Sequence, residues 1–151
     1  MYRHFGSRDG LLAEVLLQIY EESFDQQFDA VRRLLEGSGP ISEDDVVDSV
    51  PLPHGGVSAK QHAVRSQVLA VAGTNPILRA KLGESLRTRR MLLGQLMNEI
   101  DSRLPDGVTF DREVLAVYVF NLNWQYNDLL GDWSVTNEQY RTLLRRTIFS
   151  R

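Results

Sequence analysis

The sequence contains no cysteine, few histidines and no long uninterrupted apolar run. Without cysteine the chain cannot form a disulfide or a thiolate metal site, and this composition fits a reducing compartment. The apolar runs are too short to span a membrane, and the first residues lack the pattern of a signal peptide. We therefore expect a soluble, cytoplasmic protein.

The residue patterns that carry enzyme chemistry are also missing. The three histidines, His4, His54 and His62, do not share a metal-ligand spacing, and the sequence has no glycine-rich phosphate loop. No nucleophile stands beside a base in the sequence, which leaves open only residues that meet in space. We expect no catalytic residue, no metal site and no cofactor, and a protein that is not an enzyme.

Length and charge set the outline of what is present. A chain of 151 residues with 42% hydrophobic residues is long enough for one domain with a well-formed core. The formal net charge is −3, so the chain as a whole does not attract nucleic acid. The sequence therefore predicts a single domain, and the apolar periodicity described below makes it all-α.

The first long periodic segment covers residues 7–36. At about 100° per residue, one set of apolar side chains keeps a single phase along the whole segment, which predicts one long helix or two nearly collinear ones. The set comprises Leu12, Leu16, Ile19, Tyr20, Phe24, Val31, Leu34 and Leu35, extended by Leu17 and Phe28. Leu11 and Val15 fall outside this face and would be exposed on an isolated helix.

Residues 37–56 are irregular, because glycine and proline recur there and the middle is acidic. Ser42 with Asp45 predicts a cap for a short helix over residues 43–49. The remainder has two interpretations. It is either a mobile solvated connection or a lid over a binding pocket.

Two further helices are predicted over residues 58–73 and from Pro76 to about Leu104. Asn75 is a suitable cap and Pro76 a suitable first-turn residue for the second of these. Its apolar face comprises Leu78, Leu82, Leu86, Leu92, Leu93, Leu96, Met97, Ile100 and Leu104. Ala80, Gly83 and Gly94 lie on the opposite face, where small residues either allow another helix to approach closely or are simply tolerated.

Residues 111–130 predict the most apolar helix, with two apolar arcs. One arc comprises Leu115, Tyr118, Val119, Leu122, Tyr126 and Leu129, and the other comprises Ala116, Val117, Phe120 and Trp124. A helix that is apolar on two sides is covered on two sides, and a partner subunit is the simplest second cover. Thr136 with Gln139 predicts a capping box for a terminal helix that ends near Ile148.

Arg89 lies within the apolar face of the 76–104 helix, in line with Leu96 and Ile100. An unpaired buried charge there would cost several kcal/mol. Arg89 must therefore extend to solvent, pair with an acid from another helix or bind an anionic ligand. An ion pair and a ligand contact both stay open at this point.

The opening residues carry the most specific motif. Tyr2, His4-Phe5, Gly6-Ser7, Arg8 and the pair Leu11-Leu12 give an aromatic residue, His-Phe, a small residue, Ser, a basic residue and a Leu pair. Gly6 can adopt the positive φ that ends a helix, and Ser7 can cap the next one. This run resembles the end of the helix-turn-helix in TetR-type transcriptional regulators, where it leads into the helix that joins the DNA-binding head to the body.

The resemblance implies a TetR-like C-terminal bundle in a homodimeric regulator, usually a repressor, that a small apolar or amphipathic effector controls. Residues 1–10 would be a remnant of the recognition helix with its turn, and residues 11–151 the effector-binding and dimerisation domain. The residues expected to contact DNA phosphates in an intact protein are Tyr2, His4 and Arg8. The candidates for the effector pocket are Phe24, Phe28, Arg89, Phe120, Asn121 and Trp124. The candidates for the dimer interface are Ala80, Gly83, Gly94, Tyr118, Leu122 and Tyr126.

The chain departs from the family in having only the end of the helix-turn-helix, so operator DNA is an expected partner only if the missing helices are present. Leu11 and Val15 would be the surface that such a head covers. The alternative is a helical ligand-binding or interaction protein without a DNA role, for example a titrating dimer partner. The nucleotide sequence upstream of Met1 discriminates between the two.

Overall fold

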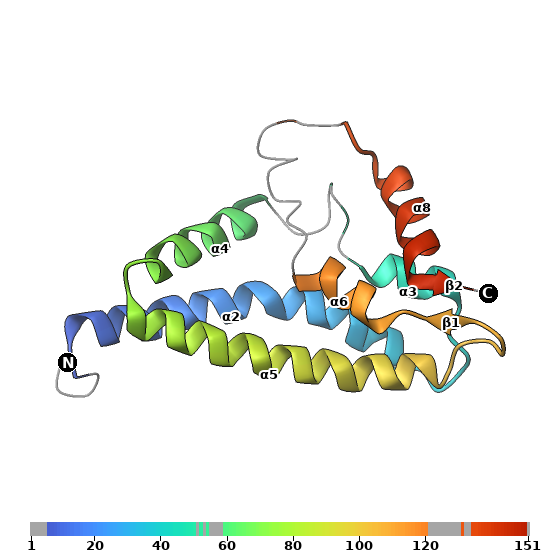
Figure 1. The fold of residues 1–151 in the computed structure, drawn as a ribbon, viewed down its shortest axis with the longest axis horizontal. Helices are drawn as coiled ribbons and strands as arrows, with labels where there is room; N and C mark the ends of the chain where they lie inside the picture. The colour runs from blue at the N-terminus through green and yellow to red at the C-terminus, as the bar shows by residue number, and fades with distance from the viewer. Residues whose placement is uncertain are drawn as a thin grey trace.

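The computed structural model describes residues 6–50, 52, 54, 59–120, 131 and 134–150. The protein is mostly helical, which confirms the predicted helical class (Figure 1). The helices in this part of the chain are α2 (Arg8–Leu35), α3 (Glu43–Ser49), α4 (Ala59–Ala72), α5 (Pro76–Asp101), α6 (Arg112–Phe120) and α8 (Asn137–Ile148). None of these helices combines the length and apolar character that crossing a membrane requires.

The long first helix is confirmed as one continuous element, α2, of 28 residues. Gly6 has a φ of 75°, and the Ser7 hydroxyl accepts a hydrogen bond from the Gly10 backbone at 3.0 Å, so the predicted corner and cap are both present. The buried residues of α2 include Ala13, Tyr20, Phe24, Phe28 and Val31.

Two residues assigned to the inward face of α2 lie outside it. Leu12 is 42% exposed and Ile19 is 36% exposed. Ile19 precedes the buried Tyr20 by one residue, which turns its side chain roughly 100° around the helix axis. The buried arc is thus narrower than the apolar arc. Val15 is exposed, as expected for a residue outside the stripe.

α5 runs beside α2 in the same direction (Figure 1). α4, which lies between these two helices in the sequence, runs in the opposite direction. The restart at Asn75 is confirmed, because its side chain accepts a hydrogen bond from the Leu78 backbone at 3.0 Å and Pro76 occupies the first turn. α5 ends at Asp101 rather than near Leu104. Arg103, just beyond this end, donates hydrogen bonds to the carbonyl oxygens of Gly39 and Leu35, which binds the loop after α2 to the end of α5.

The short helix within the irregular region contributes to the core, whereas residues 37–40 before it are exposed. α3 has the predicted capping box, in which Ser42 and Asp45 each accept from the other's backbone N–H. Val46 and Val47 on α3 are almost completely buried, at 0% and 1% exposure. The apolar face of α3 is part of the packing between α2 and α8. The two interpretations of the remainder, a mobile connection or a lid, stay predictions.

The carboxyl-terminal part packs on α3 and α6. Thr136 and Gln139 form the predicted capping box of α8, which ends at Ile148 as expected, and Tyr140, Leu144 and Ile148 are fully buried. The Asp48 and Asp44 carboxylates pair with Arg141 and Arg145. These ion pairs and the apolar face together position α8 on α3.

Two short strands were not predicted. β1 (Thr109–Phe110) and β2 (Phe149–Ser150) pair antiparallel, with Phe110 opposite Phe149. Two residues are too few to produce a period-two pattern, so the sequence carries no signal for them. β1 directly precedes α6, whose predicted continuation through residues 121–130 lies outside the described residues.

Candidate ligand-binding site

Three phenylalanines from distant parts of the chain meet in the middle of the molecule. Phe24 and Phe28 come from successive turns of α2, and Phe120 is the last residue of α6. The Phe120 ring centroid lies 6.1 Å from that of Phe24 and 6.1 Å from that of Phe28. Tyr20 extends the group, at 5.0 Å from Phe24. We call these four residues the aromatic cluster.

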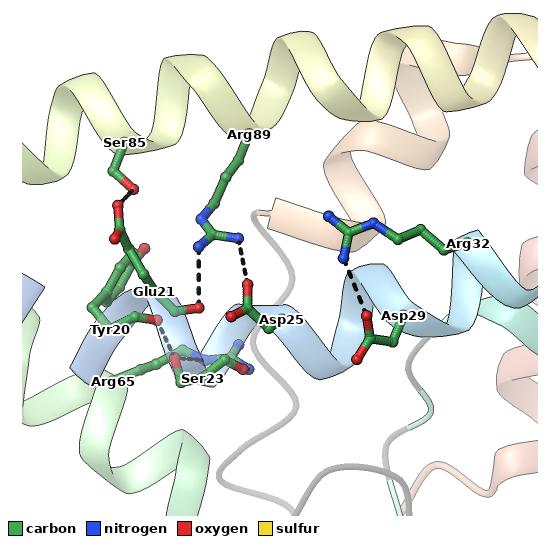
Figure 2. A network of polar contacts seen from close by, with 9 residues as sticks. All are labelled: Tyr20, Glu21, Ser23, Asp25, Asp29, Arg32, Arg65, Ser85 and Arg89. Atoms are coloured by element: carbon green, nitrogen blue, oxygen red, sulfur yellow. Dashed lines mark hydrogen bonds and ion pairs between the residues drawn. The ribbon is translucent and has the colours of Figure 1, made fainter. Parts of the chain in front are cut away.

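Arg89 from α5 joins the aromatic cluster. Its guanidinium carbon lies 5.7 Å from the Phe24 ring centroid and 5.8 Å from that of Phe28, within cation–π range. Its Nη1 is 3.3 Å from the Asp25 carboxylate, and its Nη2 donates to the Glu21 carbonyl oxygen at 3.1 Å (Figure 2). The acid that the sequence required from another helix is therefore Asp25 of α2.

The structure thus brings together four of the six residues expected to line an effector pocket, namely Phe24, Phe28, Arg89 and Phe120. Asn121 and Trp124 lie outside the described residues. The four come from α2, α5 and α6, so only the folded chain places them in contact. Their proximity makes a compact, largely buried apolar group with a positive charge beside it.

Sequence reasoning missed Arg65 of α4, which approaches α2 from the side opposite Arg89 (Figure 2). Arg65 is only 8% exposed, and its guanidinium carbon lies 4.4 Å from the Phe24 ring centroid. Its Nε donates to the Ser23 hydroxyl at 2.8 Å and its Nη2 to the Ser23 carbonyl oxygen at 2.6 Å. One signal was available. Arg65 precedes the buried Val68 by three residues and so shares its side of the helix.

Burial dominates the electrostatics of this group. Loss of hydration lowers the pKa of Arg65 to about 10, partly offset by the nearby Tyr20, while Arg89 adds like-charge repulsion. Burial also raises the pKa of the Tyr20 phenol, and the two arginines oppose that rise. Arg65 therefore keeps its charge near neutral pH at an electrostatic cost.

Two clefts adjoin the site. One of about 470 Å³ lies between α2 and α5, and its lining includes Glu21, Asp25 and Arg89. The other, of about 380 Å³, lies between α5 and α6 and includes Gly94 and Phe120 in its lining. The first is lined largely by charged side chains, whereas the second reaches the ring of Phe120 directly.

The residues expected at a dimer interface have different surroundings. Ala80 is exposed, and Gly83 and Gly94 are partly buried on the outer side of α5. A methyl group at Gly94 would meet no atom within 4 Å, so no described helix packs closely there. Tyr118 is buried inside the chain, where its ring lies 5.6 Å from Tyr140 of α8.

Tyr118 donates to or accepts from the Thr147 hydroxyl at 3.1 Å. This contact and its burial take its side chain away from any surface that a partner could reach, because α8 covers that arc of α6. The exposed apolar residue of α6 is Val117, at 48% exposure, on the second predicted arc. Leu122 and Tyr126 lie outside the described residues.

Of the residues expected to contact DNA, only Arg8 is described. It is the first residue of α2 and is exposed, whereas Tyr2 and His4 lie outside the described residues. Within the described ranges, no three His, Asp or Glu side chains are grouped so that they could hold a metal ion. Comparisons with models of protein families, with curated proteins and with solved structures found no match.

Proposed function

We propose that this chain is the effector-binding and dimerisation body of a TetR-type transcriptional regulator that acts in the cytoplasm as a homodimer. The opening motif supports the family, and the aromatic cluster supports a small apolar or amphipathic effector. In such a regulator the ligand binds in the body and changes the position of the DNA-binding heads. The cluster then binds the ligand, and α2 carries the response.

One observation carries this proposal: a single unbroken helix connects the two features. α2 begins at the corner formed by Gly6 and Ser7 and continues to Leu35, with Phe24 and Phe28 on its buried face. A helix is stiff along its axis, so a ligand that displaces the rings of Phe24 or Phe28 also displaces the amino end of α2. The opening motif lies at that end of α2.

Thermal unfolding with a panel of small apolar and amphipathic compounds tests ligand binding. A compound at a hundred times its Kd stabilises a protein by about 2.7 kcal/mol, which raises the Tm of a chain of this size by roughly 5–10 °C. We expect at least one compound to do so for the wild type and to lose the effect in Phe120→Ala. Leu143→Ala, on the exposed side of α8, is the matched control and should keep it.

Hydrogen exchange with the same compound separates a regulator from a simple binding protein. A regulator should show altered exchange in the first turns of α2, residues 8–19, as well as around the aromatic cluster. A change confined to the cluster would favour the helical ligand-binding protein without a DNA role. A panel in which no compound raises the Tm would count against both.

A further inference from the structure

Arg65 carries a buried charge that none of its described neighbours neutralises. Both of its acceptors belong to Ser23 and are neutral, namely the hydroxyl and the backbone carbonyl. Within the described part of the chain, no carboxylate lies within 4.0 Å of the Arg65 guanidinium. Two further arginines with largely buried side chains do form ion pairs. Arg89 pairs with Asp25, and Arg103 pairs with Glu99. Arg65 therefore differs from them in kind.

A second positive charge, that of Arg89, lies near Arg65. Arg65 and Arg89 both lie against the Phe24 ring, at 4.4 Å and 5.7 Å. Among the described residues, the carboxylate paired with either arginine is that of Asp25, whose side chain is 56% exposed and therefore largely hydrated. In addition, the buried Nε of Arg89 has no hydrogen-bond partner in the part of the chain that the structure describes.

Hydrogen bonds that hold α4 to α2 do not by themselves require an arginine. Hydrogen bonds to Ser23 could come from a neutral donor, whereas a buried guanidinium loses its hydration without a compensating anion. A guanidinium is, however, the side chain best shaped to bind a carboxylate through two parallel hydrogen bonds. Its position over the Phe24 ring of the aromatic cluster suits a ligand with one anionic end and an apolar remainder.

We propose that Arg65 binds the anionic end of an amphipathic carboxylate whose apolar part lies against Phe24, Phe28 and Phe120. The inference rests on the proposed function, because it names the ligand class of the same site. Among the described residues, Arg65 is a buried arginine without an acid, so one carboxylate matches its charge. Arg89 adds to the attraction as a second, partly neutralised charge, and Arg65 makes the contact.

Decanoate and decanol are suitable probes, because they share a chain length and differ in charge. Calorimetric titration of the whole chain should give a Kd for decanoate at least about tenfold below that for decanol. Arg65→Met should bring the two Kd values together, mainly by weakening decanoate. Arg65→Lys should retain part of the preference, because it keeps the charge and loses the two-pronged geometry.

Arg79→Met is the matched control. Arg79 also binds α4 through backbone carbonyls, at 3.1 Å to Ala72 and 2.9 Å to Gly73, but it is exposed and distant from the aromatic cluster in sequence and fold. This variant should therefore keep the wild-type preference for decanoate. A structural role for Arg65 alone predicts that Arg65→Met lowers the Tm and leaves the ratio of the two Kd values unchanged.

The outcomes separate this inference from the proposed function. Equal Kd values for decanoate and decanol in the wild type would overturn the inference and leave the apolar site intact. An undiminished preference in Arg65→Met would also overturn it. If Arg65→Met fails to fold, the ratio of the two Kd values in the wild type and in Arg65→Lys tests the inference instead. Binding of neither probe would count against the inference, while the wider compound panel would then decide on the proposed function.

Discussion

At the scale of single residues, Asn75 both caps α5 and joins it to α2. Its side-chain oxygen accepts from the Leu78 backbone at 3.0 Å and caps α5. Its side-chain nitrogen donates to the Asp9 carbonyl oxygen at 3.3 Å, in the first turn of α2. Asn75 is 5% exposed, so a lost contact is not replaced by water.

Asn75→Ala should therefore lower the free energy of unfolding by about 1–2 kcal/mol, the usual effect of losing an amino-terminal cap. Asn75→Ser should recover part of this, because its hydroxyl can cap α5 but does not replace the donor to Asp9. Thr74→Ala, at the exposed neighbouring position, is the control. Urea denaturation measures the unfolding free energy of each variant. Equal stability of wild type and Asn75→Ala would contradict the prediction.

Caps could be predicted from the sequence because they act within three residues. Ser7, Ser42, Asn75 and Thr136 all cap the helices that they were expected to cap. Arg65 could not be predicted, because its role depends on α4 lying across Ser23, 42 residues earlier in the chain. For Arg89, an ion pair was one of the alternatives that the sequence left open, and its partner Asp25 could not be predicted.

At the scale of elements, Asp45 makes the start of α3 sensitive to acid. The Asp45 carboxylate accepts from the Ser42 hydroxyl at 2.6 Å and from the Ser42 backbone at 2.9 Å, and these bonds lower its pKa. A carboxyl group whose pKa is lowered by folding stabilises the fold above its unfolded pKa of about 3.9. That stabilisation is lost as the pH falls through the lower, folded pKa.

We expect the wild type to exceed Asp45→Asn in unfolding free energy by roughly 0.5 kcal/mol near neutral pH, a small value because Asp45 is exposed to screening solvent. The difference should shrink as the pH falls below the unfolded pKa of about 3.9 and through the lower, folded pKa. Urea denaturation across this range measures it, with Asp106→Asn in the exposed turn as the control. A difference that grew on acidification would have the wrong sign.

Two neighbouring leucines of the terminal helix α8 should differ strongly in their effect on stability. Leu144 is fully buried against the core, whereas Leu143 is 46% exposed. Leu144→Ala should cost about 2–5 kcal/mol, because it opens a cavity where α8 meets the core, and Leu143→Ala should change stability by less than about 0.5 kcal/mol. Chemical denaturation gives both values. Similar losses in the two variants would mean that α8 does not pack as described.

Helix boundaries and apolar faces were largely predictable, but the extent of burial was not. Leu12 and Ile19 belong to the apolar stripe of α2 and are exposed, because the buried arc depends on where α4 and α5 lie. The pairing of β1 with β2 joins residues 109–110 to 149–150, and a pattern of two residues carries no period. Tyr118 was a candidate for the dimer interface, yet its ring packs against Tyr140 of α8.

At the scale of the whole molecule, the exposed outer sides of α5 and α6 are the surface proposed for dimerisation. Met91 is 68% exposed and Val117 is 48% exposed, and Gly94 between them in sequence has open space above it. A two-fold dimer would bury this apolar surface against a second copy of itself.

Sedimentation at micromolar concentration should therefore show a dimer. Val117→Glu should shift the wild-type dimer toward monomer, because the interface would have to desolvate two carboxylates. Leu143→Glu changes a similarly exposed leucine on α8 and should leave the dimer intact. A wild type that sediments only as a monomer would refute the proposed interface.

The central claim is that a ligand binds at the aromatic cluster, and the ring signals of the phenylalanines test it most directly. The chain has six phenylalanines. Phe24, Phe28 and Phe120 form the site, while Phe110 and Phe149 pair with each other at 5.9 Å on β1 and β2. NMR of the chain with ¹³C-labelled phenylalanine rings, titrated with decanoate, should show saturable shifts for the first three signals and none for the second pair. Saturable shifts confined to Phe110 and Phe149, or shifts of no ring, would contradict the account.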